Sequence, residues 1–214
     1  MDNALIIFIK NPIKGKVKTR IARTVGDDEA LAIYLQLSEI TRNNALLLMG
    51  VKTYLFYDDF IEKNDNWSND YFEKHLQTGN DLGERMLNAF GFVLKTHTSA
   101  CIIGSDCPTL SVEIIQQSFE QLADYDTVLG PSTDGGYYLL GLKKERFQGE
   151  NKQLSLLTAL HHLFNDMVWS TEHVLSNTLK RIKENHQTVS LLPELTDIDE
   201  EADWLIFQKN RECN

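Results

Sequence analysis

Short hydrophobic runs alternate along this chain with segments whose apolar side chains recur every three or four positions. The runs are typical of buried strands and the wider spacing of amphipathic helices. The predicted strands cover residues 4–9, 51–57, 99–104, 127–130, 137–142 and 188–192. The predicted helices cover residues 27–40, 82–93, 111–122, 154–164, 171–185 and 199–209. Residues 58–80 are polar and aromatic, and their pattern favours neither structure.

Side chains that cap helices support three of these helix starts. Asp27 precedes Asp28 and Glu29, Asp81 stands three residues before Glu84, and Ser111 precedes an apolar face. Such residues accept hydrogen bonds from the free N–H groups of a first helical turn. We therefore expect helices to begin at these points.

The alternation of strands and helices predicts an α/β fold. A mainly parallel sheet covered by helices on both faces is the arrangement that this order produces. The short link between Gly130 and Tyr137 predicts one antiparallel strand in that sheet. The chain has no internal repeat and no linker rich in Pro, Gly or Ser, so residues 1–214 are expected to form a single domain.

Composition and the first residues indicate the cellular compartment of the protein. No apolar run approaches the ~20 residues that cross a bilayer, so no membrane span is predicted. The first residues lack the basic flank and cleavage site of a signal peptide, which predicts a cytoplasmic protein. Cys101, Cys107 and Cys213 have no zinc-site spacing and are expected to be reduced thiols.

The net charge of −10 argues against nucleic acid as a partner, because nucleic-acid-binding proteins usually present a dominant basic face. One segment differs from the rest: no acidic residue occurs between Asp2 and Asp27, and six cations do. They are Lys10, Lys14, Lys16, Lys18, Arg20 and Arg23. This run is either a solvated surface or a site for a small polyphosphate.

In open α/β sheets ligands bind beyond the carboxyl ends of the strands. After the first strand, Pro12 and Gly15 shape a turn, and the backbone near Gly15 together with Lys18 and Arg20 could hold phosphates. Lys10 begins the same loop. The alternative is an exposed basic loop.

Two later loops carry carboxylates. Ser105 and Asp106 follow a buried strand, and Asp106 either holds a hard cation such as Mg²⁺ or caps a turn. Asp134, followed by Gly135, Gly136 and Tyr137, is read either as a hairpin turn or as a base or second carboxylate beside a ligand.

Other polar residues are weaker candidates. Asp197 and Asp199 fit a helix cap better than a metal site, and Trp169 precedes a predicted helix. The histidines lack a zinc-protease spacing and are expected to be structural.

Six segments in order resemble one bacterial family, the nucleotide-diphospho-sugar transferase-like proteins also called DUF2064, some of which carry an arsenosugar biosynthesis glycosyltransferase label. The matching segments are FIKNPIKGKVKTRIA (8–22), GNDLGERMLNAF (79–90), IIGSDCPTL (102–110), VLGPSTDGGYYLLGL (128–142), WST (169–171) and DID (197–199). The resemblance implies a GT-A type fold, a three-layer α/β/α sandwich. It also implies that the amino-terminal basic loop covers the nucleotide and that Asp106 stands where glycosyltransferases carry a metal-binding DxD motif. Gly104-Ser105-Asp106 departs from that motif by having one carboxylate, so Asp134 is a candidate for the second.

Together these features predict a transferase that binds a nucleotide-diphosphate sugar through Mg²⁺ or Mn²⁺ and moves the glycosyl group to an unknown acceptor. Lys18, Arg20 and the metal would stabilise charge on the leaving diphosphate, and Asp134 would serve as the base. The alternatives are nucleotidyl transfer with release of pyrophosphate and nucleotide binding without turnover.

Overall fold

The structure, a computed structural model, describes residues 2–147, 158 and 160–212. Within these residues one sheet of seven strands runs through the molecule in the order β3-β2-β1-β4-β6-β5-β7. The strands are β1 (Asn3–Ile9), β2 (Val51–Tyr57), β3 (Phe72–Leu76), β4 (Ser99–Ile103), β5 (Thr127–Pro131), β6 (Tyr137–Lys143) and β7 (Val189–Leu191). Strand β6 is antiparallel to β4 and β5, and the other pairs are parallel. The predicted mixed, mainly parallel sheet is confirmed.

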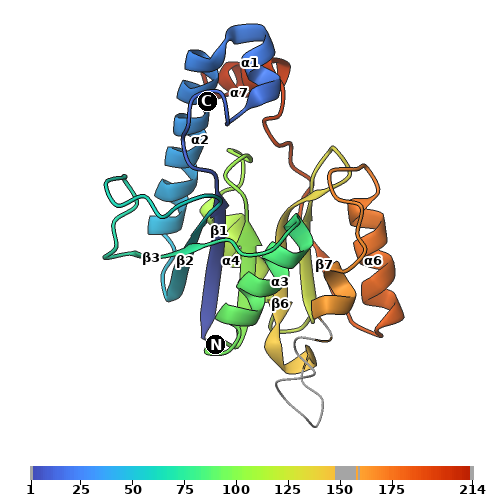
Figure 1. The fold of residues 1–214 in the computed structure, drawn as a ribbon. Coiled ribbons are helices and arrows are strands. Elements are labelled where there is room, and N and C mark those ends of the chain that lie inside the picture. Colours follow the sequence, from blue (N-terminus) through green and yellow to red (C-terminus); the bar gives the residue numbers. More distant parts are fainter. Residues whose placement is uncertain (1, 148–157, 159, 213–214) are drawn as a thin grey trace.

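Helices cover both faces of this sheet, with α3 and α6 on one side and α2 and α4 on the other (Figure 1). The described helices are α1 (Thr19–Val25), α2 (Asp27–Leu46), α3 (Leu82–Val93), α4 (Val112–Gln121), the short 3₁₀ helix η1 (Lys144–Phe147), α6 (Val174–Glu184) and α7 (Glu201–Glu212). The predicted helix over 154–164 falls partly outside the described residues, and its described residues, 158 and 160–164, are helical. The three-layer α/β/α arrangement is the expected one.

The helix starts follow local chemistry in two of the three predicted cases. Asp81 accepts a hydrogen bond from the Glu84 amide at 2.8 Å, and Ser111 accepts one from the Ile114 amide at 3.4 Å. The prediction that Asp27 caps α2 is wrong, because Gly26 occupies the capping position with φ 87° and Asp27 is the first helical residue. A positive φ favours glycine, and the carboxylate of Asp27 still lies near the positive end of the helix dipole.

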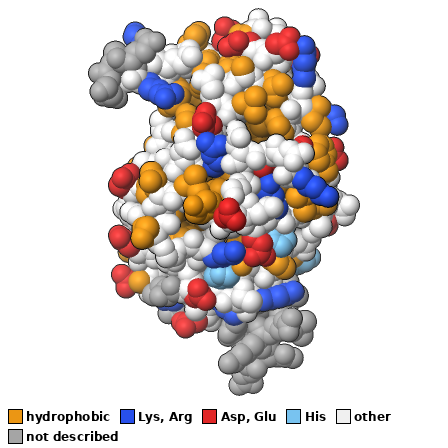
Figure 2. Space-filling view, turned by 90° about the vertical axis from the view of Figure 1, so that its left-hand side faces the viewer, with side chains coloured by type: hydrophobic (Ala, Val, Ile, Leu, Met, Phe, Trp, Pro, Cys, Tyr) orange, Lys and Arg blue, Asp and Glu red, His pale blue; other side chains and the backbone are white. Residues whose placement is uncertain are grey.

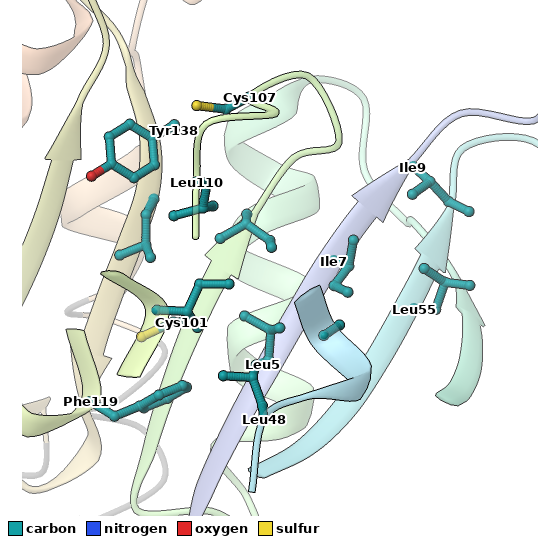
Figure 3. Packing of buried hydrophobic residues seen from close by; sticks show 14 of the residues in the cluster. Leu5, Ile7, Ile9, Leu48, Leu55, Cys101, Cys107, Leu110, Phe119 and Tyr138 are labelled. Atoms are coloured by element: carbon teal, nitrogen blue, oxygen red, sulfur yellow. The ribbon is translucent and has the colours of Figure 1, made fainter. Parts of the chain in front are cut away.

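Each sheet face has its own apolar core. Ile6, Phe90 and Leu140 are fully buried on the α3 side. On the α4 side, Figure 3 shows side chains of β1, β2 and β4 packed together, among them Leu5, Leu55 and Cys101. Burial of strands on both faces explains why their sequences read as continuous apolar runs.

Three elements were not predicted: β3, α1 and the short η1. Strand β3 pairs with β2 at the sheet edge, and its sequence Phe-Glu-Lys-His-Leu carries too few apolar residues to signal a strand. Helix α1 lies in the basic segment and packs with α2 and α7 around Ile21, Ile33 and Trp204. This group stands above the carboxyl ends of the central strands (Figure 1), so α1 depends on tertiary contacts.

The surface shows no dominant basic area on the side nearest β3, where basic and acidic side chains are interspersed (Figure 2). In the described part of the chain, no helix is both long enough and apolar enough to cross a membrane.

Candidate functional site

A cavity of about 470 Å³ opens at the carboxyl ends of β1, β2 and β4. Six candidates named from the sequence line it: Lys10, Lys18, Ser105, Asp106, Tyr137 and the weaker candidate Asp197. The cavity is therefore at the strand-end position where ligands bind in open α/β sheets.

Lys18 and Asp106 meet in this cavity from distant parts of the sequence. The Nζ atom of Lys18 lies 2.6 Å from Oδ1 of Asp106 and donates a hydrogen bond to the carbonyl oxygen of Ile198, also at 2.6 Å. The Lys18 side chain is 6% exposed and that of Asp106 is 47% exposed. Lys18 adopts a left-handed backbone conformation, φ 46°, directly before α1. A non-glycine residue held in this region is strained, a condition that recurs at functional sites.

Asp197 joins the same cavity because the segment before α7 runs beside the loops that follow β4 and β5. The Ile198 amide donates to the Asp106 carbonyl at 2.8 Å, and the Thr133 amide donates to the Leu195 carbonyl at 3.0 Å. Asp197 lies between these contacts and lines the cavity. The backbone thus brings a second carboxylate to Asp106.

The pKa of Asp197 is raised from the ordinary 3.8 to about 7. Burial is the main cause, followed by the negative charges of Asp106, Asp134 and Asp199, while Lys18 acts in the opposite direction. The neighbouring carboxylates therefore form one electrostatically coupled group that favours a cation.

Asp134 lies in the turn between β5 and β6 and does not line the cavity. Its Oδ1 atom accepts hydrogen bonds from the Ser132 hydroxyl and from the Gly136 amide. Gly135 has φ 85°, and a Cβ atom there would lie 2.3 Å from the Glu172 carbonyl oxygen. The turn therefore requires glycine for close packing against the segment before α6. The role of Asp134 as a base stays a prediction.

The cations of the amino-terminal basic loop lie in different environments. Lys14 pairs with Asp28 at 2.6 Å and Lys16 approaches Asp59 at 3.8 Å, and both lysine side chains are more than half exposed. Arg20 pairs with Asp199 at 3.2 Å. Neither Gly15 nor Arg20 lines the cavity, and Pro12 lines a neighbouring cavity of about 410 Å³. Lys18 is the cation of this segment that reaches Asp106.

Tyr34 fixes the start of this loop. Its hydroxyl donates to the Lys10 carbonyl at 2.7 Å and accepts from the Lys10 amide at 2.9 Å. Burial raises the pKa of Tyr34, so the hydroxyl stays protonated. Asp58 holds the next residue by accepting from the Asn11 amide at 2.7 Å. These contacts hold the loop against the ends of β1 and β2.

Several cavity residues were missed by the sequence reasoning: Tyr34, Asp58, Gln77, Arg85, Tyr138 and Ser170. The signal for Asp58 was present, because it directly follows the predicted strand β2, and the strand-end rule applied there would have found it. Gln77 directly follows β3, a strand that the sequence does not signal, so the rule could not find it. Arg85 and Tyr34 come from helices, where no such rule applies.

The oxygen ligands available in the cavity fit a hard cation. No group of three or more His, Cys, Asp or Glu side chains spaced to hold a metal occurs among the residues that the structure describes. Mg²⁺ commonly takes one or two carboxylates and fills its other positions with water and substrate phosphates. Asp106 and Asp197 match that pattern.

Comparison with solved structures finds the same fold. A candidate nucleotide-diphospho-sugar transferase from Desulfovibrio desulfuricans G20 has a TM-score of 0.80 and 26% identity, covering 93% of this chain and 83% of its own. The CMP:2-keto-3-deoxy-manno-octonic acid synthetase, solved with CTP, has a TM-score of 0.61 and 9% identity over 99% of both chains. A protein from Mycobacterium tuberculosis H37Rv, solved in complex with manganese, has a TM-score of 0.55 and 10% identity, covering 98% of this chain and 99% of its own.

Residues 42–171 match the sequence pattern of the family described as "Uncharacterized protein conserved in bacteria (DUF2064)". No curated protein matches the chain.

Proposed function

The chain belongs to the DUF2064 family, and we propose that it is a metal-dependent transferase acting on a nucleotide-diphosphate sugar. The metal would be Mg²⁺ or Mn²⁺, and the glycosyl group would move to an acceptor of unknown identity. The likeness to a candidate nucleotide-diphospho-sugar transferase at 26% identity supports this choice.

The observation that carries the proposal is the pairing of Asp106 and Asp197 in one cavity beside Lys18. Burial, and then the negative charge of Asp106, raises the pKa of Asp197, so the two carboxylates repel each other when both are ionised. Asp106 and Asp197 would hold a divalent cation, whose positive charge would offset this repulsion and favour a diphosphate nearby. Asp197 thus replaces Asp134 as the proposed second metal ligand.

A bound divalent cation would supply positive charge for the diphosphate that leaves in glycosyl transfer. Lys18 would release Asp106 as the cation binds and donate from Nζ to a phosphate oxygen. Its left-handed backbone and the Ile198 carbonyl already fix its position, so little reorganisation is needed. Lys10 begins the loop over the same cavity and would add a second positive charge.

The remaining predicted residues have supporting roles in this proposal. Gly135 and Gly136 shape the turn that holds Asp134, and Asp134 is proposed as the base for the acceptor hydroxyl. Arg20 would act on phosphates only after leaving Asp199, so its contribution should be smaller than that of Lys18.

Nucleotidyl transfer is the second candidate. In that reaction a substrate phosphate attacks the α-phosphate of a nucleoside triphosphate and pyrophosphate leaves. Lys14 and Lys16 are exposed in the same basic loop as Lys18, and their added positive charge suits the longer triphosphate. Nucleotide binding without turnover is the third.

Product analysis separates the three candidates. The purified protein is incubated with panels of nucleotide sugars or nucleoside triphosphates and mixed acceptors, with Mg²⁺, Mn²⁺ or chelator. Release of nucleoside diphosphate supports glycosyl transfer, and release of pyrophosphate supports nucleotidyl transfer. If nucleotide binds but neither product is released, the protein binds nucleotides without turnover.

A binding experiment tests the metal site by itself. We expect nucleotides to raise the melting temperature of wild-type protein only when divalent metal is present, and Asp106→Asn to remove this effect while folding normally. Asp124→Asn, an equal charge change at an exposed position, is the matched control. An equal shift in chelator, or a wild-type response in Asp106→Asn, would contradict the proposed site.

A further inference from the structure

Besides Lys10 and Lys18, the cavity is lined by a third cation, Arg85, on the side away from Asp106. Arg85, in the first turn of α3, lines the cavity together with Leu82 and Met86 of the same helix. Arg85 is partly buried. Its side chain donates two hydrogen bonds, from Nε to the Gly79 carbonyl at 3.3 Å and from Nη1 to Oε1 of Gln77 at 3.4 Å. Both acceptors are uncharged.

No carboxylate among the described residues forms an ion pair with Arg85. The adjacent acid, Glu84, is occupied elsewhere, because its Oε2 atom accepts from the amide and the side chain of Asn80 at 2.8 and 3.0 Å. A guanidinium has five N–H donors, and two are used here, which leaves three without an acceptor among the described residues. Such a fork matches the planar oxygens of a phosphate or a carboxylate.

Gln77 holds this guanidinium in place and is itself fixed from three sides. Its backbone amide donates to the Tyr57 carbonyl at 2.9 Å, and its side-chain Nε2 donates to the carbonyls of Ile9 and Phe56 at 3.2 and 3.0 Å. These carbonyls stand at the ends of β1 and β2. Arg85 is therefore positioned over β1 and β2, whereas Asp106 follows β4 on the other side of β1.

The positions of Lys18 and Arg85 differ in what they can bind. Lys18 is neutralised by Asp106 in the absence of ligand, and its surroundings are acidic, which suits a metal-bound diphosphate. Arg85 shares the cavity lining with apolar side chains, Phe8, Leu82 and Met86, and forms no ion pair with a described carboxylate. Asp58, which also lines the cavity, accepts a hydrogen bond from the Asn11 amide. A cation beside apolar surface gains most from a ligand anion that is itself partly desolvated.

We propose that Arg85 binds an anionic group, a phosphate or carboxylate, on the second substrate of the transferase, with Gln77 as its positioning residue. This inference rests on the proposed function, because it assigns the metal end of the cavity to the nucleotide. It adds that the unknown acceptor is an acidic small molecule.

Inorganic phosphate is the probe that tests Arg85. It is titrated, at constant ionic strength, into wild-type protein and into Arg85→Gln, Arg85→Lys and Lys95→Gln, with and without CDP and Mg²⁺. Lys95 is exposed beyond the end of α3, so Lys95→Gln removes the same charge outside the cavity. We expect Arg85→Gln to weaken phosphate binding by about ten- to a hundred-fold, Arg85→Lys to weaken it less, and Lys95→Gln to leave it unchanged.

Binding of CDP with Mg²⁺ should be the same in Arg85→Gln and wild type. Loss of CDP binding with unchanged phosphate binding would overturn the proposal and place Arg85 in the nucleotide site. Absence of saturable phosphate binding to wild type, or equal affinity in Arg85→Gln, would also overturn it. Failure of CDP to bind wild type would count against the proposed function alone, because the titration without nucleotide still reports on Arg85. Thermal unfolding of each variant confirms that it is folded.

Discussion

Replacing Asp197 with asparagine should make the ligand-free protein more stable while abolishing its response to metal. In wild type the folded state raises the pKa of this carboxyl from 3.8 to about 7, whereas the unfolded chain returns it to its ordinary value. Between about pH 4 and pH 7 the folded state therefore holds a proton that the unfolded state lacks, and stability falls as pH rises through this window. Above about pH 7 the folded state carries the full free-energy cost of an ionised Asp197.

The size of the penalty follows from this difference in pKa. At 1.36 kcal/mol per pH unit, a change from 3.8 to about 7 gives about 4 kcal/mol as an upper limit. Asp197 is partly exposed to the cavity, so water and counter-ions should reduce this to about 2 kcal/mol. For a chain of this length that raises the melting temperature of Asp197→Asn by about 4–8 °C.

The assay is thermal unfolding in chelator at pH 5 and pH 8, for wild type, Asp197→Asn and the exposed control Asp124→Asn. The advantage of Asp197→Asn should be larger at pH 8 than at pH 5, and Asp124→Asn should show no such dependence. With Mg²⁺ and nucleotide, only wild type and the control should gain stability. A lower melting temperature for Asp197→Asn at pH 8 in chelator would refute the reasoning, because it would mean that favourable contacts hold the carboxylate.

Four further substitutions test other parts of the structure. Lys18→Ala should weaken nucleotide binding by about ten- to a hundred-fold in calorimetric titration, since one charge-assisted contact is lost, whereas Lys14→Ala, at an exposed position, should leave the affinity nearly unchanged; equal losses would indicate a diffuse basic patch. Gly135→Ala should lower the free energy of unfolding in urea by more than about 1 kcal/mol, because its Cβ would lie 2.3 Å from the Glu172 carbonyl oxygen; wild-type stability would show that the turn relaxes. Phe90→Ala, at a fully buried position of α3, should cost about 3–5 kcal/mol in the same assay, and a loss below ~1 kcal/mol would contradict tight packing there.

The sequence by itself was sufficient for the elements whose signals are local. Strands β1 and β4 consist mostly of one apolar run and β2 ends in one, and the side chains of Asp81 and Ser111 cap α3 and α4 in the structure. The spacing of apolar positions and the capping of helices depend on residues close together in the sequence, so both can be recognised before the fold is known. The alternation of these elements was then enough to predict the sheet and the edge where Asp106 lies.

Tertiary structure decided the elements and contacts that lack a local signal. Edge strand β3 has a polar sequence and forms by pairing with β2, and α1 forms in a basic segment through packing of Ile21 against α2 and α7. The same holds for the candidate site. Asp106 could be found because it follows a strand, but its partner Asp197 is brought to it by the hydrogen bond from the Ile198 amide to the Asp106 carbonyl. A contact between residues so far apart along the chain depends on how the loops after β4 and β5 pack against the segment before α7, and no local pattern encodes that packing.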